Sequence, residues 1–259
     1  MRAKSPTPSS EPHTRAWLAF EENLKSVSHL LYMGGREAYL MQAAAARVKA
    51  YFDKLGDLKV KTNLVKAARS AGRLAKAMGP RIERYQTANL WQVVMLVTCV
   101  EAYLQDVFSA AAGVDPDLMN ESQQLAPYAD IVAATSLDEL ADQLRARWAR
   151  AWLSDGGPTR WISRLERMGA RGYPADLAPR LELVWGIRHA AVHAAGVATA
   201  DFVKRHPGFV KAAGARLRIG ARPFGVFLKA VRDFVEPTEK YFVARHPSLG
   251  VTGTTGPAK

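Results

Sequence analysis

The stretch LWQVVMLVTCVEAYLQDVFSAAA, residues 90–112, decides the fold class of this chain. Its apolar residues recur every three or four positions, which is the period of one face of an α-helix. We therefore predict a long helix from about residue 82 to residue 112, ended by Gly113 and Pro116. One apolar row on this helix surrounds a single carboxylate, and its members are Val94, Val97, Glu101, Leu104 and Phe108.

The same helical period extends over most of the chain on either side. It predicts helices over residues 17–31, 39–55, 62–78, 158–168, 179–195 and from about 223 to 242. A further helix over residues 136–153 opens with Ser136 and Glu139 in the capping-box arrangement. Only residues 216–219 alternate as a strand does, so at most one small β element is expected there. The sequence predicts an all-α fold.

Glycine and proline residues divide the predicted helices into regions. Gly79 and Pro80 mark a predicted seam between a helical extension and a main domain. Residues 1–13 and 247–259 are rich in Pro, Ser, Gly and Thr and are predicted to be disordered tails. We assign residues 14–84 to a basic helical extension and residues 85–246 to a helical domain.

The composition is that of an ordinary globular protein, with 259 residues of which 48% are apolar and 23% charged. The single cysteine, Cys99, excludes a disulfide framework and a multi-cysteine zinc site. One cysteine and an N-terminus without a secretory pattern favour a reducing compartment, so we expect a cytoplasmic protein. The longest apolar run, residues 93–100, is shorter than the roughly 20 residues of a membrane span, and no membrane partner is expected.

The net charge of +12 is unevenly spread along the chain. Residues 1–90 hold 16 Lys and Arg against 7 Asp and Glu, whereas residues 91–259 hold 20 against 17. Five of the first group recur at spacings of 7, 3, 4 and 3, so they share one helix face, which is typical of a helix that follows a phosphate backbone. A solvated face of an ordinary amphipathic helix and a membrane-surface helix are the alternatives. The basic stripe consists of Lys59, Lys66, Arg69, Arg73 and Lys76.

Tryptophan residues lie at helical positions along the chain. We predict that they belong to the core rather than to a platform on which nucleic-acid bases stack. Five of them are Trp17, Trp91, Trp148, Trp152 and Trp161.

The candidate chemistry lies in WGIRHAAVHAAG, residues 185–196. The chain has no P-loop, no Gly-x-Gly-x-x-Gly, no Gly-x-Ser-x-Gly and no His-Glu-x-x-His. Arg188, His189 and His193 instead lie near the end of an otherwise apolar helix, where such side chains need partners or a cleft. An imidazole can transfer protons near neutral pH, and a guanidinium group can hold a phosphate.

Two other interpretations of the histidines stay open. Glu182, His189 and His193 lie at spacings of 7 and 4 on one helical stripe, where they could ligate a metal ion. Alternatively, the histidines have only a structural role in helix packing.

Residues 185–196 resemble the motif of the HEPN superfamily (higher eukaryotes and prokaryotes nucleotide-binding), in which an Arg is followed after four to six residues by a His. Arg188, the polar residue His189 after it, and His193 match this motif, and Gly196 follows as in a frequent form of it. Residues 96–108, LVTCVEAYLQDVF, resemble the long facing helix of that fold, which often carries an acidic residue. The resemblance covers residues 85–245 and implies an HEPN-like antiparallel helical bundle.

The resemblance also implies a function. Ribonuclease members of the superfamily are metal-independent endoribonucleases that cleave RNA through its own 2′-OH, and they act as homodimers in toxin or defence roles. Here Arg188 would bind the scissile phosphate, His193 would transfer protons, His189 would assist, and Glu101 would hold Arg188. For Glu101 the alternative is a carboxylate at the edge of the core that reaches water.

The expected partners are therefore RNA, a second copy of the chain and, for a toxin, a cognate antitoxin; no cofactor is expected. Two alternative functions stay open. The first is an HEPN-like module that binds RNA or dimerises without cutting. The second is a nucleic-acid-binding regulator that acts through the basic helix over residues 59–84.

Overall fold

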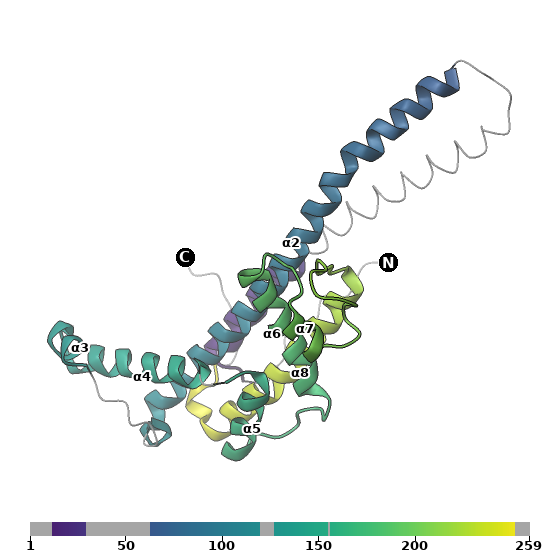
Figure 1. The fold of residues 1–259 in the computed structure, drawn as a ribbon. Coiled ribbons are helices and arrows are strands. Elements are labelled where there is room, and N and C mark those ends of the chain that lie inside the picture. Colours follow the sequence, from purple (N-terminus) through teal and green to yellow (C-terminus); the bar gives the residue numbers. More distant parts are fainter. Residues whose placement is uncertain (1–11, 30–62, 120–126, 155, 252–259) are drawn as a thin grey trace. The chain divides into compact units, whose positions relative to one another are not determined.

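The computed structural model describes residues 12–29, 63–119, 127–154 and 156–251, with residues 63–85 described by their backbone alone. The described chain is mostly helical and contains no sheet, which confirms the all-α prediction (Figure 1). Its elements are a helical segment over residues 15–29, α2 (Asn63–Val114), α3 (Tyr128–Ala133), α4 (Leu137–Ser154), α5 (Pro158–Met168), α6 (Leu177–His193), α7 (Ala200–Arg205) and α8 (Ala221–Arg245). Two short 3-10 helices, Pro116–Met119 and Pro247–Leu249, follow α2 and α8.

The predicted long helix is present, but it begins almost 20 residues earlier than expected. α2 runs from Asn63 to Val114 without a break, so the predicted stop at Gly79 and Pro80 is wrong. A proline disfavours the helical conformation of the residue before it partly through that residue's Cβ, and Gly79 has none. The helix therefore continues with the loss of one backbone hydrogen bond. The proposed boundary between residues 84 and 85 falls inside α2 and stays a prediction.

Most other helices begin and end close to their predicted bounds. α5 covers Pro158–Met168 as expected, and α6 begins two residues before the predicted 179. At the start of α4, Ser136 Oγ accepts a hydrogen bond from the Glu139 amide at 3.1 Å, which confirms the cap. The helices α3 and α7 were not predicted, because six residues are too few to show a period. The predicted tails and the predicted helix over residues 39–55 lie outside the described residues, apart from 12–13 and 247–251.

The chain divides into two compact units. The first unit takes its described residues from Met1–Lys25, Leu96–Trp185 and Phe227–Lys259. The second unit takes its described residues from Ser26–Met95 and Gly186–Val226. The segment 15–29, α2, α6 and α8 each contribute residues to both units.

A buried carboxylate organises the core of the first unit. Glu239 of α8 is only 2% exposed, and it accepts hydrogen bonds from the Thr14 amide (2.5 Å), the Thr14 hydroxyl (2.9 Å) and the Tyr103 hydroxyl (3.0 Å). Burial, followed by the negative charge of Glu239, raises the pKa of Tyr103 well above its usual range, so this hydroxyl stays protonated and donates. Thr14 Oγ1 also accepts from the Trp17 amide and thereby caps the helical segment that follows. One side chain thus ties together the N-terminal segment, α2 and α8.

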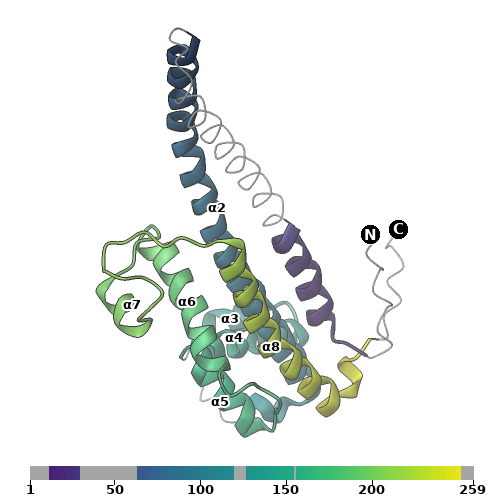
Figure 2. The same ribbon diagram turned by 90° about the vertical axis from the view of Figure 1, so that its right-hand side faces the viewer.

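Contacts along α8 give the direction of its neighbours. Tyr103 meets Glu239 and Phe108 meets Phe242, so α2 and α8 run in the same direction. The helix α6 runs antiparallel to α8, since Tyr173 bonds Thr238 and Arg180 bonds Asp233. The segment 15–29 is also antiparallel to α8, since Thr14 bonds Glu239 and Arg232 bonds Glu21, and Figure 2 shows it along α8.

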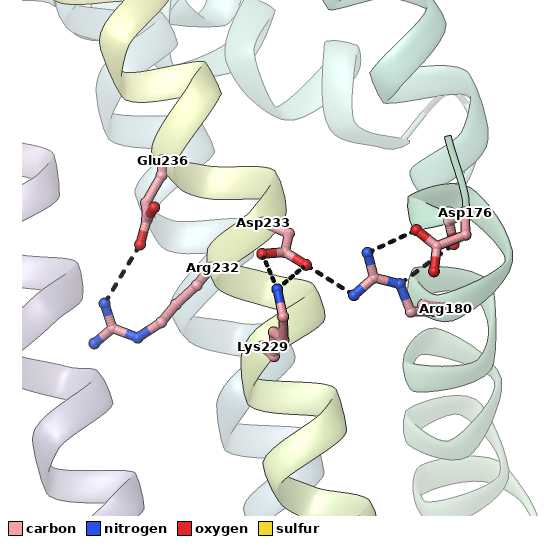
Figure 3. A network of polar contacts seen from close by, with 6 residues as sticks. All are labelled: Asp176, Arg180, Lys229, Arg232, Asp233 and Glu236. Carbon is pink, nitrogen blue, oxygen red and sulfur yellow. Dashed lines mark hydrogen bonds and ion pairs between the residues drawn. The ribbon is translucent and has the colours of Figure 1, made fainter. Parts of the chain in front are cut away.

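A row of ion pairs reinforces this packing at the surface (Figure 3). Arg180 of α6 bridges Asp176 and Asp233, and Lys229 also pairs with Asp233. Burial alone would raise the pKa of Asp233, but hydrogen bonds from Lys229 and Arg180, together with their charges, hold it below its usual range. On the other side of α8, Arg232 pairs with Glu21 of the N-terminal segment at 2.9 Å and with Glu236.

One stretch of α2, Gln86–Val114, is long and apolar enough to cross a membrane by length and composition. Half of its most apolar window is buried inside the protein. A core helix of a soluble protein has the same properties, so this one helix is weak evidence for a membrane span.

We predict that Glu239→Gln lowers the free energy of unfolding by about 1–3 kcal/mol, because the amide presents an extra donor to three buried donors. Thermal or urea unfolding followed by circular dichroism measures this change. The matched control is Glu236→Gln, three residues earlier on α8 with a side chain 48% exposed, which should stay within about 0.5 kcal/mol of wild type. Equal stability of the two variants would show that the buried carboxylate does not organise this core.

Candidate active site

The helix that carries the candidate motif is unbroken through Gly186. A Cβ placed on Gly186 would lie 2.6 Å from His206 Nε2 and 3.3 Å from a ring carbon of Phe202. Glycine is therefore required here by the close approach of α7, on which Phe202 is buried. The Trp-Gly pair before Arg188 thus marks a packing contact rather than a break in α6.

A sharp turn ends α6 directly after the motif. Ala195 and Gly196 have φ angles of 49° and 75°, and the Ala190 carbonyl accepts hydrogen bonds from the amides of Ala194 (3.0 Å) and Gly196 (2.9 Å). A Cβ on Gly196 would lie 2.5 Å from Leu90 Cδ2 of α2, and Leu90 is buried. Gly196 is therefore required both by its backbone conformation and by the approach of α2.

The structure brings the two histidines of the motif together. Their ring centres are 4.6 Å apart with the ring planes at 45°, and both side chains are exposed to solvent. This follows from their spacing of four, which places them one turn apart on the same face of α6. The pair can therefore receive a ligand from solvent, and its rings can hold or transfer protons there.

Arg188 lies on a different side of α6 from His193. Residues five apart on a regular helix differ by about 140° around its axis. Arg188 is half-buried, and its Nε is a buried donor without a hydrogen-bond partner in the described part of the chain. No hydrogen bond or ion pair joins Arg188 to either histidine among the described contacts. The motif of one chain thus presents the histidine pair and the arginine separately.

The other predicted site residues lie outside this cluster. Glu101 is half-buried on α2 in the first unit, whereas Arg188 belongs to the second unit, so their pairing stays a prediction. Lys59 lies outside the described residues. The backbone of α2 carries the rest of the basic stripe on one continuous helix, which agrees with the predicted helical spacing; these residues are Lys66, Arg69, Arg73 and Lys76.

The described side chains do not support the metal interpretation. No group of three His, Cys, Asp or Glu residues among them lies close enough to hold a metal ion. The Glu182 carboxylate instead accepts hydrogen bonds from the Thr159 amide (3.2 Å) and the Thr159 hydroxyl (2.9 Å) at the start of α5. Glu182 thus stabilises the first turn of α5.

Sequence reasoning missed the charge that surrounds the histidines. Residues 186–226 hold seven Lys and Arg against one acidic residue, Asp201, a net charge of +6. The remaining residues of 91–259 have a net charge of −3, so the near balance of that region hid a strongly basic segment. A charge count over 40-residue windows would have found this segment.

One prediction about aromatic residues also needs correction. Trp17, Trp148 and Trp161 are buried as expected, but Trp91 is 52% exposed. Periodicity places Trp91 on a helix and does not show which face of α2 the rest of the second unit covers.

No protein-family model matches the sequence, and the chain has no significant match among curated proteins or solved structures. The HEPN resemblance therefore depends on the motif residues alone.

We predict that Gly196→Ala lowers the free energy of unfolding by about 2–4 kcal/mol, since it combines a strained backbone with a clash against Leu90. Gly214→Ala is the matched control, because Gly214 has a φ of 84° but no atom within 4 Å of its added Cβ. The control should lose only the backbone contribution of about 1–2 kcal/mol. Urea unfolding of both variants measures the difference, and equal losses would show that the Leu90 contact contributes nothing.

Proposed function

We propose that this chain is a metal-independent endoribonuclease of HEPN type, which cleaves RNA by attack of its own 2′-OH on the adjacent phosphate. The single observation that carries the proposal is the exposed pair His189 and His193, whose rings lie next to each other at the end of α6 within a strongly basic segment. The 2′-OH must lose a proton and the leaving 5′-oxygen must gain one, and histidine suits both transfers near neutral pH. The proposed setting is the cytoplasm, in a toxin or defence role where a cognate antitoxin would restrain the enzyme.

Each motif residue has a role in this proposal. His193 transfers protons, His189 assists or positions the substrate, and Arg188 binds the scissile phosphate through its planar guanidinium group. Glu101 would orient Arg188. The basic stripe, whose residues Lys66, Arg69, Arg73 and Lys76 lie on α2, would bind parts of the RNA other than the bond that is cleaved.

The proposed active form is a homodimer. His193 of one chain cannot be both base and acid at the same instant, and Arg188 of the same chain lies on another side of α6. A two-fold axis that faces two motifs across one cleft supplies two histidines and two arginines. Exposed apolar residues support such a contact in the second unit: Trp91 (52%) and Met95 (50%) lie one turn apart on α2, and Val192 (41%) lies between the histidines. The contact of Leu90 with Gly196 places this part of α2 beside the end of α6.

A non-catalytic RNA-binding module is the second candidate. The observation that favours it is the half-buried Arg188, whose Nε is enclosed and which makes no described hydrogen bond to the histidines. In that case the histidines and the surrounding basic residues would bind RNA without cutting it.

His193→Ala should abolish cleavage of total RNA while leaving RNA binding within about threefold of wild type, since only one ring is lost and the surrounding Lys and Arg side chains remain. Gel analysis of the RNA, with and without EDTA, measures cleavage, and filter binding measures affinity. Wild-type activity should be equal in both conditions. His29→Ala is the matched control, because His29 is a histidine on another helical segment, and it should cleave normally. Purified wild-type protein that cuts no RNA in either condition would leave only the binding candidate.

Trp91→Glu combined with Met95→Glu should convert a dimer into monomers and reduce cleavage at least tenfold, because two buried carboxylates in an interface carry a large desolvation cost. Sedimentation velocity measures the mass and gel analysis the cleavage. The control is Ile131→Glu with Val132→Glu, which changes two apolar residues of α3 in the first unit that are 50% and 65% exposed. A wild-type monomer that is fully active would overturn the dimer proposal.

A further inference from the structure

The segment after α7 places two arginines next to the end of the motif helix. Residues 214–218 form backbone hydrogen bonds with residues 196–198, the first residues after the turn that ends α6. Leu217 N donates to Gly196 O at 2.8 Å, and Ala198 N donates to Ala215 O at 2.8 Å. Arg216 and Val197 form an isolated antiparallel bridge. His193 is three residues before Gly196, so this segment lies at the same end of α6 as the histidine pair.

The two arginines of this segment point outward on the same side. Leu217 and Ile219 are buried, at 3% and 2% exposure, whereas Arg216 and Arg218 are both exposed. The sequence predicts this alternation of buried and exposed residues over 216–219. The structure forms one isolated bridge there, between Arg216 and Val197, and not a strand. In an extended backbone, residues two apart lie about 6.7 Å apart and project to one side. Asn89 of α2 donates to the Ile219 carbonyl at 2.8 Å, so the segment is held at both ends.

Among the side chains that the structure describes, no acidic group pairs with these arginines. Asp201 is the single carboxylate among the described side chains of the second unit, and it pairs with Arg205 of its own helix. Arg216 and Arg218 have no hydrogen bond or ion pair to a described side chain. Unpaired positive charge on a surface repels itself, and a polyanion relieves that repulsion. The planar guanidinium group of an arginine on an anchored backbone also matches phosphate geometry better than a lysine ammonium group does.

We propose that Arg216 and Arg218 form a phosphate-binding ridge that holds a single strand of RNA beside the histidine pair. The ridge consists of these two residues and acts by positioning: it fixes the backbone next to the phosphate that is cleaved, and it takes no part in proton transfer. This inference rests on the proposed ribonuclease function for its choice of RNA. Its binding claim can be tested without any cleavage.

The test uses the full chain with the Arg216→Gln and Arg218→Gln changes in a His193→Ala background, which separates binding from cutting. Fluorescence anisotropy with a labelled 20-nucleotide single-stranded RNA, between 50 and 200 mM salt, gives the affinity and its salt slope. Loss of two phosphate contacts should weaken binding about 10–100-fold and reduce the slope of log K against log salt by about 1.4. The control, Arg150→Gln with Arg167→Gln, removes the same charge from two exposed arginines of the first unit and should retain most of the affinity.

In an otherwise wild-type chain, the ridge variant should raise KM for RNA about tenfold or more and leave kcat within about threefold, because the histidines are unchanged.

Equal weakening of RNA binding by the ridge and control variants would overturn the inference, since net charge alone would explain it. Binding that the ridge variant leaves unchanged would also overturn it, and the ribonuclease proposal would stand if cleavage persists. If the wild type binds RNA through the ridge but cuts none, the ridge is supported and the ribonuclease proposal fails. Equal ridge-dependent binding to vesicles with 30% phosphatidylserine would instead identify a lipid surface as the ligand and overturn the RNA assignment.

Discussion

The arrangement of the candidate site depends on one reversal of the backbone, at Ala195 and Gly196. The reversal requires two successive residues with positive φ, and it requires the second to lack a Cβ because Leu90 of α2 occupies that space. It ends α6 directly after His193 and leaves the histidine pair at a helix terminus. It also presents the carbonyl of Gly196 to Leu217, so the same turn that ends the motif helix anchors Arg216 and Arg218. A bulkier residue at position 196 would strain this backbone and meet Leu90.

Helical periodicity predicted most of the fold, because a helix that covers a core repeats its apolar residues over several turns. The prediction failed where a local stop signal lies within a long helix and where a helix is too short to show a period. Gly79 and Pro80 form a typical stop signal, but the helix on either side is long, and Gly79 lacks the Cβ that makes a residue before proline avoid helix. The helices α3 and α7 are shorter than two full turns and show no period. Residues 216–219 alternate as predicted, but their partner segment is short, so only one bridge forms.

The site was predictable to the extent that it lies on one helix. Spacing alone places His189 and His193 on one face of α6, and the structure confirms that their rings are adjacent. Spacing also implies that Arg188 lies about 140° from His193, which the match to a family motif does not reveal. Glu101 is a different case, because its expected pairing with Arg188 depends on how separate parts of the chain fold together. No periodicity contains that information. The exposure of Trp91 shows the same limit, since a sequence gives the helix but not the neighbour that covers each face.

The distribution of charge connects these observations. A division at residue 90 places +9 in the N-terminal part and +3 in the rest, and by that count the motif lies in an almost neutral region. The two compact units divide the chain at other positions. Residues 186–226, the part of the second unit that contains the motif, have a net charge of +6, and the rest of residues 91–259 has a net charge of −3. Basic residues spread along a long helix attract a polyanion but do not fix which phosphate lies at which residue. Arginines on an anchored backbone can fix that position. The basic stripe on α2 and the ridge at Arg216 and Arg218 therefore need not duplicate each other. In the proposed function, the long helix would increase the local concentration of RNA, and the short anchored segment beside the histidines would decide which phosphate reaches them.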